Sequence, residues 1–469
     1  MHDFRSFIKL LEESRNLVRV SREVDRKYEM PAVISRLEKQ GKAYLFEHVK
    51  GSEFPVVGGL LNSAERLALA LQRPSPDTVT HSEIAELLAT ATLSPIAYEV
   101  VDNGPVKEVI NIGDAIDLEK IPVPTYFELD SGPFITGAVG VSQNEEAGQL
   151  NVGFYRCQIV SQDSMIINAS SMSDLKQIYA YAESNGTSMP IAMVIGPDPA
   201  LLMCASGKHP PGVSELEIAG ALQGRPIDMV KCETSDLLVP ANAEIIIEGR
   251  VDFSQKIENT LGEFADQYGP ETAPLTNITA ITHRRDAMFY TIMAGRHPEH
   301  NTIGAISTYG MQAVLSDELK RQFPNIDEIN VSCDARMGCM LHVFVSIHKE
   351  NDEEPRELIK SAFEAHTGLF PVGTIVKRIV VVDEDIDVFN LEDTEWAIWT
   401  RVGDASKYMI FPDVVSWEIE RCAKEGQRSI RIGIDATKDL EDADRLIRPI
   451  IPDYGDLRIE DYVEPDDRH

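Results

Sequence analysis

Hydrophobic residues at the start of the chain recur at the spacing of an amphipathic helix. The positions are Phe4, Phe7, Ile8 and Leu11. Two short apolar runs follow, YLFEHV at 44–49 and FPVVGGLL at 54–61, and both are typical of strands. A second helix is predicted at HSEIAELLATA (81–91), and the proline-rich stretch 121–134 then interrupts regular structure. The pattern predicts an N-terminal α/β region over residues 1–115.

From residue 135 to about residue 294, the chain consists of short apolar runs separated by brief breaks. The runs that we interpret as strands are ITGAVGVSQ, QLNVGFYRCQIV, SMIINASS, MPIAMVIG, AEIIIEGRVD, LTNITAITHRR and AMFYTIMAG. Many strands at such spacing predict a barrel or a sandwich. Two helices interrupt them: SDLKQIYAYAES (173–184), and a helix that begins near Ser214, where Ser-Glu-Leu-Glu has the form of a capping box. The predicted unit spans residues 116–300.

Helices and strands alternate after residue 300, which is typical of an α/β domain. The apolar run 379–382 is followed by acidic residues, as expected at the carboxyl end of a buried strand. We therefore predict a second α/β domain over residues 301–469. Its acidic, proline-punctuated tail from Asp439 to His469 is expected either to pack as an arm on a partner or to be partly disordered.

Size and charge restrict the class of protein. A chain of 469 residues exceeds one hydrophobic core, so two or three domains are expected. The net charge of -32 argues against a broad nucleic-acid or anionic-membrane surface, although it does not exclude a local basic pocket. We find no long apolar run and no signal-like start, which favours a soluble, cytoplasmic protein. Six cysteines without a CxxC pair do not indicate a disulfide framework or a zinc site.

Several segments, in order and at fitting separations, resemble the UbiD family of decarboxylases. They are NVGFYR (151–156), KCETSDLLVPANAEIIIEG (231–249), LGEF (261–264), VVVDEDIDVFNLEDTEWAIWTR (380–401) and RIGIDAT (431–437). The resemblance implies an N-terminal α/β region, a central flavin-reductase-like split β-barrel and a C-terminal α/β domain that drives oligomerisation. This division agrees with the three regions predicted from the hydrophobic pattern.

The resemblance also implies an activity and its cofactors. The expected reaction is the reversible, non-oxidative decarboxylation of an aromatic or α,β-unsaturated acid with prenylated FMN, held by Mn²⁺ (or Mg²⁺) and often K⁺. Loss of CO₂ from an sp² carbon needs an electron sink that side chains lack, so a cofactor must supply it. A flavin prenyltransferase would supply the cofactor, and a homodimer or homohexamer is expected.

Arg156 is the first catalytic residue that the resemblance assigns. A guanidinium can grip a carboxylate in bidentate fashion, so Arg156 is expected to pair with a catalytic glutamate and with the substrate. Asn151 stands five residues earlier, and positions five apart on a regular strand face opposite sides. Both reach one site only if a bulge intervenes or the cofactor lies across the strand edge. A surface salt bridge is the alternative interpretation of Arg156.

Glu258 and Glu263, again five residues apart, would complete a Glu-Arg-Glu triad. We assign Glu263 as the acid that protonates the product, because a desolvated site would raise its pKa while Arg156 keeps the other glutamate ionised. Gly262 is expected to give the backbone freedom beside this acid. For Glu258 the alternative is a solvated acidic loop.

The resemblance places Asn151 and Glu233 among the ligands of the divalent ion, and Asn151, Arg156 and Glu233 in contact with the cofactor. Amide and carboxylate oxygens suit Mn²⁺ or Mg²⁺ better than zinc. The third family ligand is usually a histidine, but Asp174 stands at that place here. Asp174 is therefore either a ligand or the N-cap of the following helix. If the stretch is misaligned with the family pattern, Ser170 or Ser171 stands nearer the metal.

Other polar clusters carry weaker hypotheses. In GRHPEHN, Arg296 and His297, with His300, are interpreted as a wall of the substrate pocket, with an ordinary loop as the alternative. Lys208 and His209 are candidate anion contacts. The acidic segment 380–401 is not expected to form a second metal site. Its tryptophans, Trp396 and Trp399, are expected in the core or at a dimer contact.

Two other functions stay open. The same machinery could act as a carboxylase or on a phosphorylated isoprenoid precursor such as anhydromevalonate phosphate. A different class is a non-catalytic flavin-binding subunit of a carboxylase complex. Retention of Arg156, Glu258 and Glu263 argues against a non-catalytic subunit, whereas Asp174 in place of the usual histidine keeps that possibility open.

Overall fold

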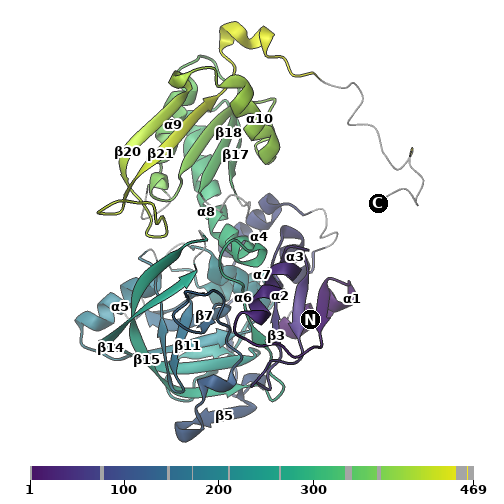
Figure 1. Cartoon of the computed structure of the whole chain (residues 1–469), viewed down its shortest axis with the longest axis vertical. Coiled ribbons are helices and arrows are strands. Elements are labelled where there is room, and N and C mark those ends of the chain that lie inside the picture. The colour runs from purple at the N-terminus through teal and green to yellow at the C-terminus, as the bar shows by residue number, and fades with distance from the viewer. Residues whose placement is uncertain are drawn as a thin grey trace.

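The computed structural model describes residues 3–73, 79–144, 148–171, 173–209, 212–262, 266–332, 341–366, 371–449 and residue 462. Figure 1 shows a larger body built from the first two thirds of the chain and a smaller C-terminal domain above it, with the long helix α8 between them. Glu263 lies outside the described residues, as do Cys333 and Cys339.

The N-terminal region forms a small sheet with helices around it. Its elements are α1 (Phe4–Glu13), β1 (Leu17–Val20), α2 (Glu29–Glu38), β2 (Ala43–Phe46), β3 (Val56–Gly58), α3 (Ala64–Ala70), α4 (His81–Leu93), β4 (Glu99–Val100) and β5 (Val109–Ile112). The predicted apolar face of α1 is confirmed, because Phe4, Phe7, Ile8 and Leu11 are its buried residues. The sheet has the order β1-β2-β3-β16, so it is completed by a strand from much later in the chain.

The central region is dominated by one nine-stranded sheet. The strands and helices of this region are β6 (Phe134–Ile135), β7 (Ala138–Asn144), β8 (Gln149–Phe154), β9 (Cys157–Ser161), β10 (Ser164–Ile167), α5 (Asp174–Ser184), β11 (Met189–Ile195), α6 (Pro199–Ser206), α7 (Glu215–Gln223), β12 (Asp228–Lys231), β13 (Leu238–Pro240), β14 (Ile245–Gly262), β15 (Tyr268–His283) and β16 (Phe289–Tyr290). Of these, β12 and β13 form a separate small sheet with β4, and β16 joins the N-terminal sheet. The strand order of the nine-stranded sheet is β6-β9-β10-β15-β14-β11-β7-β8, with β5 beside β15. Among the described strands, no pairing joins β6 to β8, so the predicted barrel is open at that point.

The C-terminal domain is a five-stranded sheet with a hydrophobic cluster on each face. It contains β17 (Ile326–Val331), β18 (His342–Ile347), α9 (Glu354–Glu364), β19 (Arg378–Asp383), α10 (Leu391–Arg401), β20 (Tyr408–Val415) and β21 (Arg428–Ala436). The three inner strands β18, β19 and β21 run parallel, and helices α9 and α10 supply apolar side chains to opposite clusters. This is the α/β architecture that the alternating pattern predicts.

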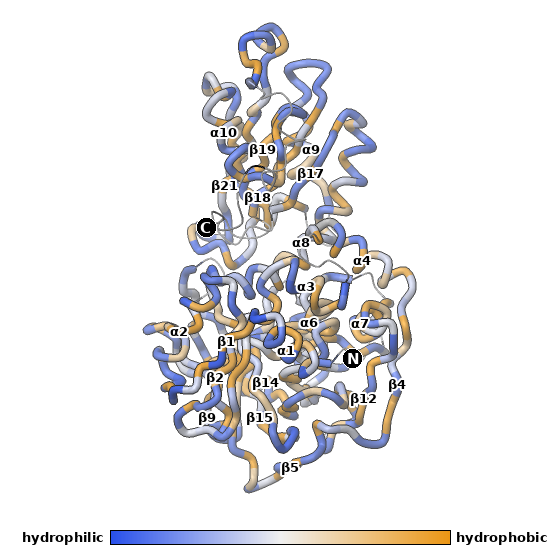
Figure 2. Tube along the Cα trace, turned by 90° about the vertical axis from the view of Figure 1, so that its right-hand side faces the viewer, coloured by the Kyte–Doolittle hydropathy of each residue, from blue (hydrophilic) through white to orange (hydrophobic). Residues whose placement is uncertain are grey.

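Helix α8 (Pro298–Gln322) connects the two bodies. Ile303, Ile306 and Tyr309 belong to the core of the larger body, whereas Met311, Leu315 and Leu319 belong to the C-terminal domain. That first core takes residues from both the N-terminal and the central region, and Figure 2 shows its hydrophobic stretches along strands such as β1, β2 and β14. No helix in the described part of the chain is both long enough and apolar enough to cross a membrane.

Candidate active site

Arg156 lies in a two-residue break between β8 and β9, together with Tyr155. Asn151 is in β8, so the alternation of a single strand does not apply to the pair. The backbone carbonyl of Arg156 accepts a hydrogen bond from the Asn168 N–H at 3.0 Å, which fixes the break against the end of β10. The break therefore takes the place of the bulge that the five-residue spacing requires.

Tyr155 occupies a groove made by two glycines that face each other on β7 and β8. Gly140 and Gly153 are partners in register, and an ideal Cβ on either would lie 2.6 or 2.7 Å from the tyrosine side chain. The ring is buried, and its hydroxyl accepts a hydrogen bond from the Asn151 amide at 3.1 Å. The glycine of the NVGFYR motif thus makes room for an aromatic ring that orients Asn151.

Arg156 is ion-paired with Glu271 on β15, whereas Glu258 on β14 is exposed. Glu271 stands in register with Asn259, so these two side chains lie on the same face of the strand pair. The side chain of Glu258, one residue earlier on β14, lies on the opposite face. Glu258 is therefore not beside Arg156 in this structure. Glu263, the proposed acid, lies outside the described residues.

Gly262 is next to Glu263, and its role differs from the backbone freedom expected of it. It is not among the glycines with positive φ, and an ideal Cβ there would lie 2.4 Å from the ring of Phe127. Its N–H donates to the Asp130 carboxylate at 3.0 Å. Close packing, rather than an unusual backbone conformation, requires the glycine.

Asn151, Asp174 and Glu215 lie around Tyr155. Asp174 is the first residue of α5, whose N-cap is Ser173, so Asp174 is not the cap. Glu215 is the first residue of α7, is half-buried, and receives a hydrogen bond from the backbone of Val152 in β8. Burial raises the pKa of Glu215 to about 7, and the negative charge of Asp174 adds to the effect. Burial also raises the pKa of Tyr155, with contributions from both carboxylates.

Lys208 forms an ion pair with Asp174 at 3.0 Å. Its positive charge offsets the negative charge of the half-buried Glu215 only in part. His209 makes a contact of 2.8 Å with the carbonyl of Cys204, and burial lowers its pKa. Ser170 and Ser171, the other residues considered near the metal, contact Glu418 of the C-terminal domain instead.

Glu233 lies in a different setting from Asn151. Its carboxylate binds Lys107 Nζ at 2.6 Å, and its N–H donates to Glu248 at 2.7 Å. Glu248 is on β14, separated from β8 by β11 and β7 in the sheet. The expected set of Asn151, Asp174 and Glu233 is therefore not assembled. Within the described ranges, no group of three or more His, Cys, Asp or Glu side chains is arranged to hold a metal.

His300 of the GRHPEHN segment lies in the neighbourhood of Arg156. Burial, with a smaller contribution from the charge of Arg156, lowers the pKa of His300 to about 4. Arg296 is exposed. His297 is buried at the start of α8, and its Nδ1 lies 3.6 Å from Oε2 of Glu38.

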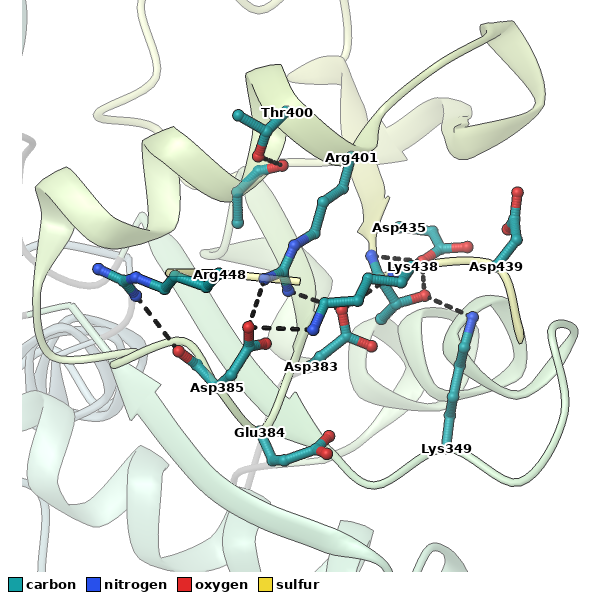
Figure 3. A network of polar contacts seen from close by, with 12 residues as sticks. Lys349, Asp383, Glu384, Asp385, Thr400, Arg401, Asp435, Lys438, Asp439 and Arg448 are labelled. Atoms are coloured by element: carbon teal, nitrogen blue, oxygen red, sulfur yellow. Dashed lines mark hydrogen bonds and ion pairs between the residues drawn. The ribbon is translucent and has the colours of Figure 1, made fainter. Parts of the chain in front are cut away.

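The acidic segment of the C-terminal domain is neutralised by basic side chains, as Figure 3 shows. Arg401 binds Asp383 at 2.6 Å and Asp385 at 2.8 Å, and Lys438 also binds Asp385. Trp396 packs against this domain's core beneath the guanidinium groups of Arg401 and Arg448, whereas Trp399 is 75% exposed. These contacts stabilise the fold of the domain.

Sequence reasoning missed Tyr155, Glu215 and Glu271. Glu215 stood in the recognised helix-start motif, where a capping function explained it. The sequence signal that could have identified Glu215 as a site residue was an acidic side chain at the first position of a predicted helix. Glu271 carried no local signal, because its position opposite Asn259 depends on the pairing register of two long strands.

Family models of 3-octaprenyl-4-hydroxybenzoate carboxy-lyase match all three regions of the chain. The N-terminal domain matches residues 8–88, the Rift-related domain residues 99–297 and the C-terminal domain residues 306–436. Fold and site thus define a carboxy-lyase with a central sheet and two α/β flanks. The chain belongs to the UbiD family and is a decarboxylase.

Three relatives illustrate the similarity. The anhydromevalonate phosphate decarboxylase of Methanosarcina mazei is 30% identical, covering 96% of this chain and 99% of its own. The UbiD-class enzyme HmfF of Pelotomaculum thermopropionicum, in complex with FMN, is 33% identical with a TM-score of 0.86, covering 98% of this chain and 100% of that chain; an evolved dimeric form holds prFMN. The vanillic acid decarboxylase of Sedimentibacter hydroxybenzoicus is 27% identical in both its open and its closed form. The open form has a TM-score of 0.82 and covers 97% of this chain and 95% of that chain. The closed form has a TM-score of 0.79 and covers 96% of this chain and 95% of that chain.

Proposed function

We propose that this chain is a prenylated-FMN-dependent decarboxylase of an aromatic or α,β-unsaturated carboxylic acid, working reversibly and without net oxidation. Two neighbouring features carry the proposal. Arg156 is paired with a carboxylate. Tyr155, the residue before it, is surrounded by the oxygen-bearing side chains of Asn151, Asp174 and Glu215. A guanidinium matches a substrate carboxylate, and oxygen ligands match a divalent ion. The HmfF complexes with FMN and prFMN support the cofactor.

In this proposal, Asn151, Asp174 and Glu215 hold Mn²⁺ (or Mg²⁺) for the cofactor phosphate, with K⁺ as a second ion. The donor set fits, because Glu215 is a half-buried carboxylate with a raised pKa next to the charge of Asp174. A divalent cation would offset both charges and keep Glu215 ionised. Glu233 leaves the proposed set because its backbone N–H is bonded to Glu248 of β14, which β11 and β7 separate from Asn151 on β8.

Prenylated FMN, when bound, supplies the electron sink that loss of CO₂ from an sp² carbon requires. Arg156 binds and orients the substrate carboxylate. Glu263 delivers the proton to the product carbon, for which it must be neutral when it acts. Glu271 is the carboxylate that pairs with Arg156 among the described residues.

A phosphorylated isoprenoid precursor such as anhydromevalonate phosphate is the second candidate substrate. The similarity to the Methanosarcina mazei enzyme over nearly the full length of both chains favours it. Such a substrate carries a second anionic group, so it needs a cation besides Arg156. Lys208, which is 58% exposed, is available near the proposed metal ligands.

The proposed assembly is a homodimer or homohexamer built through the C-terminal domain, with a flavin prenyltransferase as the supplier of cofactor. Two large apolar side chains on this domain support a contact with a second copy: Trp399 is 75% exposed and Ile410 is 66% exposed. A contact with a second copy would remove the apolar surface of both side chains from water.

The test uses the full chain co-produced with a flavin prenyltransferase and purified without oxygen. Aromatic acids, unsaturated acids and anhydromevalonate phosphate are offered in turn, and CO₂ release and bicarbonate exchange are measured. Decarboxylation of one of them, lost in Glu263→Gln with flavin retained, is expected. Bound prFMN with no turnover of any acid would favour the non-catalytic subunit, and ordinary FMN or no flavin would contradict the cofactor proposal.

A further inference from the structure

The C-terminal domain reaches the candidate active site through residues 416–427, which connect β20 to β21. This connecting loop extends from the C-terminal domain toward the ends of β14 and β15 (Figure 1). We infer that Arg421 in this loop is a positioning residue for Arg156, acting through Glu271, and that Glu418 seats the same loop on the far side of the site. The inference rests on the proposed function, in which Arg156 binds the substrate carboxylate.

Glu271 is shared between two arginines from different domains. Its Oε1 is ion-paired with Nη2 of Arg156 and lies 4.0 Å from Nη2 of Arg421. The three side chains are only 24–25% exposed, so solvent screens their interaction weakly. Nε of Arg421 is shielded from solvent and has no hydrogen-bond partner among the described residues.

Gly269 gives Arg421 its place on β15. An ideal Cβ on Gly269 would lie 1.8 Å from Cζ of Arg421 and 1.9 Å from its Nη2. The guanidinium therefore lies directly on the glycine backbone, two residues from Glu271. Gly269 is not among the glycines with positive φ, so alanine is compatible with its backbone and would displace only the arginine.

Glu418 holds the opposite side of the loop. It accepts hydrogen bonds from Ser170 Oγ at 2.8 Å, from the Ser171 N–H at 2.9 Å and from Ser171 Oγ. These serines come just before α5, whose first residue is Asp174. One loop thus contacts both the strand that carries Glu271 and the segment that leads to the proposed metal ligand.

The loop is fastened to its own domain by Glu420, between the two contact residues. Glu420 binds Lys377, Ser429 at 2.5 Å and Arg431 at 3.1 Å. Arg431 is fully buried and also binds the backbone of residues 373 and 374. A shift of the C-terminal domain is therefore transmitted to the loop as a whole. The position of Arg421 then follows the position of the domain.

The shared carboxylate sets the charge that Arg156 presents to a substrate. If Glu271 interacted with Arg156 alone, it would neutralise the guanidinium and oppose binding of another carboxylate. With Arg421 close to the same oxygen, the three groups carry one net positive charge. Placement of Arg421 by the C-terminal domain therefore keeps Arg156 able to bind an anionic substrate.

The test compares Arg421→Met with Lys424→Met, which removes a cation from an exposed position of the same loop. In the holoenzyme, using the acid that the wild type decarboxylates, Arg421→Met is expected to raise KM by about tenfold with a smaller change in kcat. Arg421→Lys should recover part of the loss, and Gly269→Ala should reproduce it with the arginine still present. Unchanged KM in both Arg421→Met and Gly269→Ala would overturn the inference.

A second measurement does not depend on turnover. The Ser171 N–H donates to Glu418, so its hydrogen exchange reports whether the loop is seated. Faster exchange around residues 168–171 in Glu418→Gln, and around 268–272 in Arg421→Met, is expected relative to Lys424→Met. Equal exchange in all variants would refute the loop contacts, whereas altered exchange in a chain that decarboxylates no acid would refute the proposed function alone.

Discussion

Asn259 and Glu271 face each other in register across β14 and β15, and this pairing brings Glu271 rather than Glu258 to Arg156. Asn259 is buried and exchanges two amide hydrogen bonds with Asn168, at 2.8 and 3.0 Å. Asn168 in turn donates its backbone N–H to the carbonyl of Arg156. One buried amide pair therefore ties the register of the two long strands to the break that carries Arg156.

Asn259→Ala is expected to lower the free energy of unfolding by about 1–3 kcal/mol, because the Asn168 amide is left buried without its partner. Urea denaturation would measure the loss. Asn277→Ala, at an exposed position on β15, is the matched control and should change stability by less than about 0.5 kcal/mol. Equal effects of the two substitutions would contradict this account of the strand register.

Glu215→Gln and Glu233→Gln separate the two candidate metal ligands. Glu215→Gln is expected to lower divalent-ion affinity by at least about 10- to 100-fold, because loss of a group outside the ligand shell already costs that much and this change removes a charged ligand. Metal content and the Mn²⁺ dependence of flavin retention would measure the effect. Glu233→Gln should bind metal as the wild type does, since Glu233 lies beside Glu248 of β14, which two strands separate from Asn151 on β8. The reverse pattern would return Glu233 to the ligand set.

Glu38 should make folding depend on pH. It is buried beside Glu299, and no side chain in the described part of the chain is hydrogen-bonded to its carboxylate oxygens. Burial raises the pKa of Glu38 from 4.5 to about 8. Glu299 accepts hydrogen bonds from three backbone N–H groups and from Tyr290, so we assign the proton to Glu38.

Because the folded state keeps a proton that the unfolded chain releases, this contribution to stability is complete below pH 4.5 and is lost as the pH rises toward 8. The slope for one such group is at most about 1.4 kcal/mol per pH unit. Glu38→Gln should flatten the pH dependence of unfolding between these limits, measured by urea denaturation. Glu13→Gln, at an exposed position of α1, should leave it unchanged.

Arg401→Met is expected to destabilise the C-terminal domain by about 3 kcal/mol, since it leaves Asp383 and Asp385 without their buried partner. Arg445→Met provides the control, because Arg445 is 79% exposed and its ion pair with Asp442 is screened by solvent. Chemical denaturation followed by fluorescence of the tryptophans in this domain would compare them. A similar small loss in both variants would mean that the network in Figure 3 contributes little.

The sequence by itself determined the elements and the family. Local periodicity is enough to place α1, because its buried side chains all come from one short segment. The same holds for β19, whose apolar run ends in Asp383. The motif around Asn151 and Arg156 also identified the right stretch of chain, because both residues and Tyr155 lie within six positions of one another.

Tertiary structure alone decided which carboxylates meet the site. The resemblance pointed to Glu233 as a ligand and not to Glu215, but the fold binds Glu233 to Lys107, and the N-terminus of α7 places Glu215 against β8. Glu271 reaches Arg156 through strand register, and Arg421 reaches Glu271 from another domain. Such contacts join residues more than sixty positions apart, and they depend on how whole elements pack, which no local pattern encodes.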